Sequence, residues 1–210
     1  MIARIKTAAT NNLDRIHKLG ICLRYPQLGR AMSIYSHLTN EERVALYNLA
    51  DGAQAIVEIG SYLGASACCF GAALKKQGSG RVYCIDTWTN DGMLEGHRDT
   101  FAAFKTNVAP FEAYVTSVRG YSTQVVSAIR EYTNQVDVLF IDGDHSYEGV
   151  KADWDAYKAF LRDGSKIVFH DWGWAEGVQR VIDEDVKRTI KNADHLPNLW
   201  WGTIDGTERV

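Results

Sequence analysis

The sequence has few residues that break or cross-link a chain. Among 210 residues there are three prolines and four cysteines, Cys22, Cys68, Cys69 and Cys84. The cysteines show no CxxC spacing and the last three lie inside apolar runs, so we expect buried free thiols rather than a zinc site or a disulfide framework. No stretch has the composition of an interdomain linker. With 46% hydrophobic residues, the chain is predicted to form one globular domain.

The sequence also lacks the patterns that nucleic acids and membranes require. Its formal net charge is −3 and no run of Lys or Arg exceeds two residues, so no basic stripe is available for phosphate backbones. No apolar stretch approaches the roughly 18 residues of a membrane span, and the first twenty residues are interrupted by charges. We therefore expect a cytoplasmic protein with neither nucleic acid nor membrane as a partner.

The pattern of predicted secondary structure changes near residue 50. Residues 1–50 are predicted to be a helical extension of the same domain, serving as a lid or as a contact in a homo-oligomer. Within it, Thr39 and Asn40 followed by Glu41 and Glu42 are typical of a helix start. Residues 51–210 are predicted to form the main domain.

Short β-rich runs alternate with helix-length segments after residue 51. We expect strands at 54–60, 81–86, 114–118, 136–142, 166–171 and 199–205, and helices near 64–76, 94–107, 122–133, 147–161 and 176–191. In the fourth of these helices, Val150, Trp154, Tyr157 and Leu161 recur on one face. Apolar strands separated by helices predict an α/β fold with a doubly wound, mostly parallel, Rossmann-like sheet.

Polar residues collect where the first two strands end, which is where ligands bind in open parallel sheets. The first strand runs into EIGSYLGAS, residues 58–66, whose glycines favour a tight turn and a helix start. The second strand ends at Asp86, an acceptor for ribose hydroxyls. An ordinary strand-to-helix turn would explain the first feature alone. A nicotinamide cofactor is disfavoured because GxGxxG is missing and Glu58 would repel a pyrophosphate. The pattern favours a cationic ligand.

Four segments carry a family resemblance: EIGSYLGAS, CIDTW, FIDGDHSYEGVKADWDAY and KIVFHDW. Together they resemble class I S-adenosylmethionine-dependent methyltransferases, in the small-molecule branch (family 24 type) with the macrocin O-methyltransferase-like and cephalosporin hydroxylase-like proteins. The similarity covers residues 52–175. It implies a class I methyltransferase fold and S-adenosylmethionine as cofactor. The cofactor contacts that it implies are Glu58, Gly60, Ser61, Gly64 and Ser66 for the methionine part, Asp86 for the ribose, Tyr121 and Ser122 for the adenine, and Asp142 and Gly143 beside them.

The resemblance also implies a metal site. Asp142 and Asp171 should end neighbouring strands, about 4.8 Å apart, and converging carboxylates suit a hard divalent cation. In related metal-dependent enzymes the ligands are an acid after the fourth strand and an acidic pair after the fifth, which match Asp142 and the pair His170 and Asp171. His170 departs from the pattern because an acid is usual there. We expect Mg²⁺ or, since imidazole is a poorer partner for magnesium, Mn²⁺. The alternative that His170 is a packing residue and not a ligand stays open.

His145 is predicted to be the general base, with Asp142 as its catalytic partner on the metal. A hydroxyl becomes a good nucleophile when its proton is removed or its oxygen lies on a metal, and an imidazole with a pKa near 6.5 suits the first task. Asp144 would orient the loop or His145, or cap the helix that begins near Ser146. The competing interpretation is that DGDH is only a polar turn with a helix cap.

These observations predict a methyltransferase that acts on a hydroxyl of a small-molecule acceptor with help from a divalent metal. Two alternatives stay open from the sequence. The first is a cofactor-binding relative that does not methylate, either hydroxylase-like or regulatory. The second is a metal-dependent hydrolase built on the same acids and His145, against which the glycine turn argues.

Overall fold

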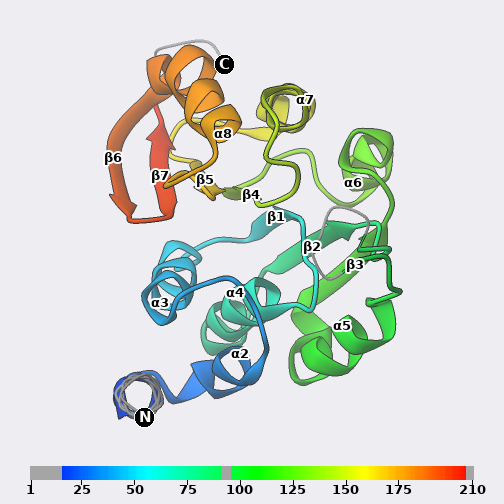
Figure 1. Cartoon of the computed structure of the whole chain (residues 1–210), viewed down its shortest axis with the longest axis vertical. Helices are drawn as coiled ribbons and strands as arrows, with labels where there is room; N and C mark the ends of the chain where they lie inside the picture. The colour runs from blue at the N-terminus through cyan, green and yellow to red at the C-terminus, as the bar shows by residue number, and fades with distance from the viewer. Residues whose placement is uncertain (1–15, 91–95, 207–210) are drawn as a thin grey trace, which may run out of the picture.

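The chain folds around one seven-stranded sheet with helices on both faces (Figure 1). This computed structural model describes residues 16–90 and 96–206. The strand order is β3-β2-β1-β4-β5-β7-β6, in which β1 to β5 pair in parallel and β7 runs antiparallel to both β5 and β6. The strands are β1 (Ala55–Ile59), β2 (Arg81–Asp86), β3 (Val115–Arg119), β4 (Val138–Ile141), β5 (Lys166–His170), β6 (Ile190–Leu196) and β7 (Leu199–Ile204). The order reverses between β1 and β4, which is where open sheets of this kind bind ligands.

The two faces of the sheet are covered by different parts of the chain (Figure 1). The helices are α2 (Gly29–Ser33), α3 (Asn40–Leu49), α4 (Ala65–Gln77), α5 (Phe101–Val108), α6 (Val126–Tyr132), α7 (Tyr147–Tyr157) and α8 (Glu176–Val181). The N-terminal helices pack with α4 and α5 into one buried apolar cluster, and α6, α7 and α8 pack into another on the opposite face. Because β1 and β4 lie between these clusters, their residues are buried almost without interruption. No helix in the described ranges is long and apolar enough to cross a membrane.

The sequence predicted the parallel strands and the apolar face of α7 well. Val150, Trp154 and Tyr157 are at most 1% exposed and Leu161 lies partly buried beside them. The predicted α4 is also confirmed, with Gly64 at its N-cap in a left-handed conformation. Cys68, Cys69 and Cys84 are buried and all four cysteines are free, as expected.

Two predicted helices were wrong in extent. The helix expected from residue 94 begins only at Phe101, where the Asp99 carboxylate accepts the N–H of Phe101, while residues 91–95 lie outside the described part. The helix expected to reach Lys191 loses α geometry after Val181, continues through one π turn and one 3-10 turn, and ends at Thr189. Lys191 instead belongs to β6, a strand that the sequence analysis missed.

The N-terminal extension packs against the rest of the domain. Residues 16–24 are helical, and α3 begins with the predicted Thr39 cap. The Glu42 N–H donates to Thr39 Oγ1 at 3.2 Å and the Thr39 N–H donates to Glu42 Oε2 at 2.7 Å, which makes a reciprocal capping box. Both α2 and α3 contact α4. The loop between α2 and α3 is thereby held at the carboxyl edge of the sheet.

Candidate functional site

A cavity of about 780 Å³ lies at the carboxyl edge of the sheet. It is bounded by the ends of β1 and β2, the loop after β3, the loop after β4, and residues 35–38 of the N-terminal extension. Five of the described residues that line it are aspartates and none is Lys or Arg; the five are Asp86, Asp142, Asp144, Asp153 and Asp171. An acidic cavity of this size suits a cationic nucleotide-like ligand and a divalent ion, and it opposes a pyrophosphate.

The predicted glycine turn is present after β1. Gly60 and Gly64 have φ values of +86° and +85°, in the region that favours glycine. A Cβ on Gly60 would lie 1.9 Å from the backbone oxygen of Asp142, and one on Gly64 would meet Val108 and Phe104. Close packing of the chain on itself therefore requires both glycines. Gly60 lines the cavity, whereas Gly64, a predicted cofactor contact, is not among the described residues that line it.

Glu58 lies behind this turn rather than on the cavity wall. Its side chain is fully buried, and Ser61 Oγ donates to its Oε2 at 2.6 Å, while Ser66 and Cys84 also lie near the carboxylate. Burial raises the pKa of Glu58 to about 7, and the hydrogen bond from Ser61 opposes the increase. Ser61 and Ser66 do line the cavity. A role for Glu58 toward a cofactor would thus act through Ser61.

Asp86 lines the cavity and also organises the glycine turn. Its Oδ2 accepts the N–H groups of Ser61 and Tyr62 at 2.9 and 2.8 Å, and its Oδ1 accepts the Trp88 N–H at 2.6 Å. These bonds leave lone-pair capacity mainly on Oδ1. The predicted ribose contact therefore falls on a carboxylate that the backbone already fixes in place.

The residues predicted to meet the adenine lie on the loop after β3. Tyr121 is 60% exposed at the cavity rim. Ser122 is tied to α7, because its Oγ donates to Asp153 Oδ1 and its carbonyl accepts the Tyr157 hydroxyl at 2.8 Å. Asp153 is 5% exposed, and burial raises its pKa to about 6. Gly143 lies between Asp153 and the end of β1, where it also lines the cavity.

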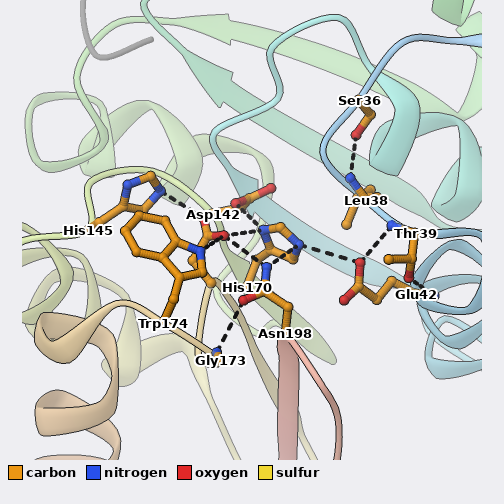
Figure 2. A network of polar contacts seen from close by, with 11 residues as sticks. Ser36, Leu38, Thr39, Glu42, Asp142, His145, His170, Gly173, Trp174 and Asn198 are labelled. Atoms are coloured by element: carbon orange, nitrogen blue, oxygen red, sulfur yellow. Dashed lines mark hydrogen bonds and ion pairs between the residues drawn. The ribbon is translucent and has the colours of Figure 1, made fainter. Parts of the chain in front are cut away.

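The predicted metal residues converge at the other end of the cavity (Figure 2). One donor atom from each of Asp142, His170 and Asp171 lies within 4.8 Å of the other two. His170 Nδ1 lies 3.0 Å from Asp142 Oδ1 and 3.3 Å from Asp171 Oδ1. Two carboxylates and one imidazole fit a divalent cation, and the nitrogen favours manganese, iron or zinc over magnesium.

His170 is enclosed by negative charge. Its side chain is 2% exposed, and Glu42 Oε2 lies 3.6 Å from Nε2. Burial alone would lower the pKa of His170, but the charge of Asp142 and hydrogen bonds to the surrounding carboxylates raise it far above its usual value. The surrounding carboxylates therefore favour the protonated ring, and an ion that binds Nδ1 would displace a proton from it.

Asp171 connects the metal residues to His145. Its Oδ2 lies 2.8 Å from His145 Nε2, while its Oδ1 accepts Trp174 Nε1–H at 2.8 Å and Asn198 Nδ2–H at 3.0 Å. Burial opposes ionisation of Asp171, yet the hydrogen bonds from His145 and His170 hold its pKa well below the usual range. The bond to Asp171 in turn raises the pKa of His145. The Trp174 ring packs edge-on against the His145 ring, with centroids 5.0 Å apart.

Asp144 does not orient His145. Its Oδ1 accepts the Ser146 N–H at 2.7 Å, and Ser146 is the N-cap of α7, with Oγ accepting the Gly149 N–H at 3.1 Å. Of the roles considered for Asp144, the loop contact is the one observed. Asp171, from the next strand end, orients the imidazole.

Three residues of the site were not predicted. Glu42 carried only the signal of a helix cap, and Asn198 lies in the turn after an unpredicted strand. Asp153 offered a usable signal, since an acid three residues after Val150 falls on the buried face of α7. A carboxylate on an apolar stripe needs a polar partner, which here is Ser122.

Fold and site together define an α/β protein with a nucleotide-sized acidic cavity at the switch point of its sheet. The sequence model of a methyltransferase domain family matches residues 57–172, more than half of the chain. The chain therefore belongs to this family of methyltransferase domains.

Individual relatives are distant. An uncharacterised protein of Acanthamoeba polyphaga mimivirus is 29% identical over 90 residues, which cover 39% of this chain and 41% of that protein. The chain spans less than half the length of the curated relatives that it matches. Among solved structures, the calicheamicin methyltransferase CalS11 has a TM-score of 0.59 at 19% identity, covering 78% of this chain and 77% of that one. MycE, solved with Mg, SAH and mycinamycin VI, has a TM-score of 0.54 at 16% identity, covering 83% and 52%. These structures share the fold.

Proposed function

We propose that this methyltransferase transfers a methyl group from S-adenosylmethionine to a hydroxyl of a small-molecule acceptor, with a divalent metal held by Asp142, His170 and Asp171. The observation that carries the proposal is the position of Asp171. Its carboxylate is one of the three converging metal donors, and it also contacts the imidazole of His145. A metal at this position would lower the pKa of an acceptor hydroxyl.

His145 takes the hydroxyl proton in this proposal. Because its Nε2 lies 2.8 Å from Asp171 Oδ2, the Nε2–H is held by the carboxylate and the lone pair is on Nδ1. Asp171 thus fixes the tautomer and stabilises the imidazolium that forms. In the transfer, a carbon–oxygen bond forms as the carbon–sulfur bond breaks, the sulfonium becomes a neutral thioether, and the hydroxyl proton goes to His145 Nδ1.

The acceptor is proposed to be a sugar-bearing or natural-product molecule. Trp174 is 60% exposed and packs edge-on beside His145, so a flat apolar surface lies next to the proposed base. Such surfaces pack against the faces of rings. The titles of two neighbours point the same way, since CalS11 is a TDP-rhamnose 3'-O-methyltransferase and MycE was solved with mycinamycin VI. The four free cysteines fit the proposed cytoplasmic location.

Metal-free methyl transfer is the second candidate. It is favoured by the position of His170 between Asp142, Asp171 and Glu42, because a protonated ring there would itself balance the carboxylates. His145 and Asp171 would then activate the hydroxyl without an ion.

One calorimetric experiment separates these candidates. S-adenosylmethionine is titrated into the protein alone, with Mg²⁺, with Mn²⁺ and after chelation, and methyl transfer is measured on a panel of glycosylated acceptors under the same four conditions. The metal-assisted proposal expects cofactor binding throughout and turnover only with metal. Full turnover after chelation would leave the metal-free candidate, and cofactor binding without product on any acceptor would favour a relative that does not methylate.

A further inference from the structure

Glu42 on α3 brings the N-terminal extension to the proposed metal centre (Figure 2). Its side chain is 1% exposed, and Oε2 lies 3.6 Å from His170 Nε2 at ion-pair range. The other ring nitrogen of His170 faces Asp142 and Asp171. The imidazole therefore stands between the N-terminal helix on one side and the two strand-end carboxylates on the other.

We propose that Glu42 is a positioning residue of the metal centre, which holds the imidazole proton of His170 on Nε2 so that Nδ1 is free to bind the ion beside Asp142 and Asp171. This inference rests on the metal in the proposed function. A neutral imidazole carries one proton on either nitrogen, and the neighbour of the far nitrogen decides which. Histidines that bind metals through one nitrogen commonly direct the other toward a carboxylate.

Asn198 is the competing neighbour of Nε2, since its Nδ2 lies 3.3 Å away. The orientation of this amide is fixed, because its Oδ1 accepts the Gly173 N–H at 3.1 Å. Nδ2 therefore presents two hydrogens, one of which reaches Asp171 Oδ1 at 3.0 Å, while the other can be accepted by Nε2 only when that nitrogen carries the lone pair. When Nδ1 binds the ion, the ring proton is on Nε2, and the acceptor that the described residues place beside it is the buried carboxylate of Glu42.

Glu42 also restores the charge that His170 removes. A neutral histidine among the ligands leaves two carboxylates around the ion, and Glu42 adds a third negative charge behind the ring. Since the side chains of Glu42 and His170 are 1% and 2% exposed, that charge acts on the ring with little screening. The sign of the effect depends on what occupies position 170. Glu42 favours binding through a histidine, and it would repel a carboxylate placed there.

That dependence on sign gives the test. Mn²⁺ is titrated into the full chain and the free ion is followed by electron paramagnetic resonance, with Co²⁺ absorption as a second spectroscopic readout. The variants are Glu42→Gln, His170→Glu and the double variant. Glutamine keeps the capping box, because its carbonyl still accepts the Thr39 N–H. Thr39→Ala is the matched control, since it removes the cap hydroxyl and leaves Glu42 beside His170.

We expect Glu42→Gln to weaken Mn²⁺ binding by about 10-fold, the low end of the effect of changing the partner of a metal-bound histidine, because the amide oxygen stays at the Oε2 position beside His170 Nε2 and only the negative charge is lost. The Co²⁺ bands should shift as well. Thr39→Ala should leave both readouts unchanged. In the His170→Glu background, Glu42→Gln should tighten binding. Equal losses in the two backgrounds would show that Glu42 is merely structural and would overturn the inference. Unchanged Mn²⁺ binding in Glu42→Gln would overturn the inference about Glu42 and leave the proposed function intact. A wild-type chain that binds no Mn²⁺ would overturn both that inference and the metal in the proposed function.

Discussion

Asp153 allows a quantitative test of how the cofactor end of the cavity is built. Burial raises its pKa from 3.8 to about 6, so the folded state binds the proton more tightly than the unfolded chain does. The stability that this group contributes is complete below pH 3.8 and is lost as the pH rises through about 6. At about 1.4 kcal/mol per pKa unit, the whole effect is about 3 kcal/mol, of which about 2 kcal/mol falls between pH 4.5 and 7.5.

Replacing Asp153 with Asn removes the titration and keeps an oxygen to accept the Ser122 hydroxyl. The free energy of unfolding is measured in urea for wild type and Asp153→Asn at pH 4.5 to 7.5. As the pH rises, the value for the variant should increase by about 2 kcal/mol relative to the wild type. Comparing the two proteins at each pH cancels all other titrating groups. Asp155→Asn is the control on the same helix, because Asp155 is exposed and paired with Lys151 and Lys158, which lower its pKa. Parallel stability curves for wild type and Asp153→Asn would refute the reasoning.

Three further predictions concern the site. Asp86→Ala should weaken S-adenosylmethionine binding by about 1–3 kcal/mol in calorimetry, and it should also lower stability because three backbone N–H groups lose their acceptor; unchanged affinity in a folded variant would remove Asp86 from the site. His145→Ala should lower kcat by about 10²–10⁴ without changing cofactor affinity, and His145→Gln should not restore it; near wild-type turnover would reduce His145 to a turn residue. Gly60→Ala should lower the melting temperature sharply, because its Cβ would overlap the Asp142 backbone oxygen; a variant that melts like wild type would contradict this packing argument.

Local patterns were sufficient for most of the sheet and for the polar strand ends. The parallel strands are buried on both faces, so each one is recorded in the sequence as a continuous apolar run. The first residues after such runs then share one edge, which places Asp142 and Asp171 together. β6 was missed because its sequence, IKNADHL, is polar and largely exposed at the sheet edge.

The partners of the site residues could not be predicted in the same way. Glu42 and His170 are far apart in sequence, and the capping box of α3 explains Glu42 locally without reference to the site. The assignment of Asp171 rather than Asp144 as the partner of His145 depends on how neighbouring strand ends are placed in space. Periodicity and caps describe single elements, whereas these contacts join elements that are far apart in the chain.

The contact between Gly60 and the backbone oxygen of Asp142 has a consequence for redesign of this enzyme. The turn after β1 and the first residue after β4 touch through main-chain atoms, with no side chain between them that could be shortened. Moving one backbone segment would therefore move the other. A graft that replaces only the turn after β1 would displace Asp142 and the proposed metal site with it. Changes of specificity should be more readily tolerated in exposed side chains that do not join the two segments, such as Tyr121 at the rim and Trp174 beside His145.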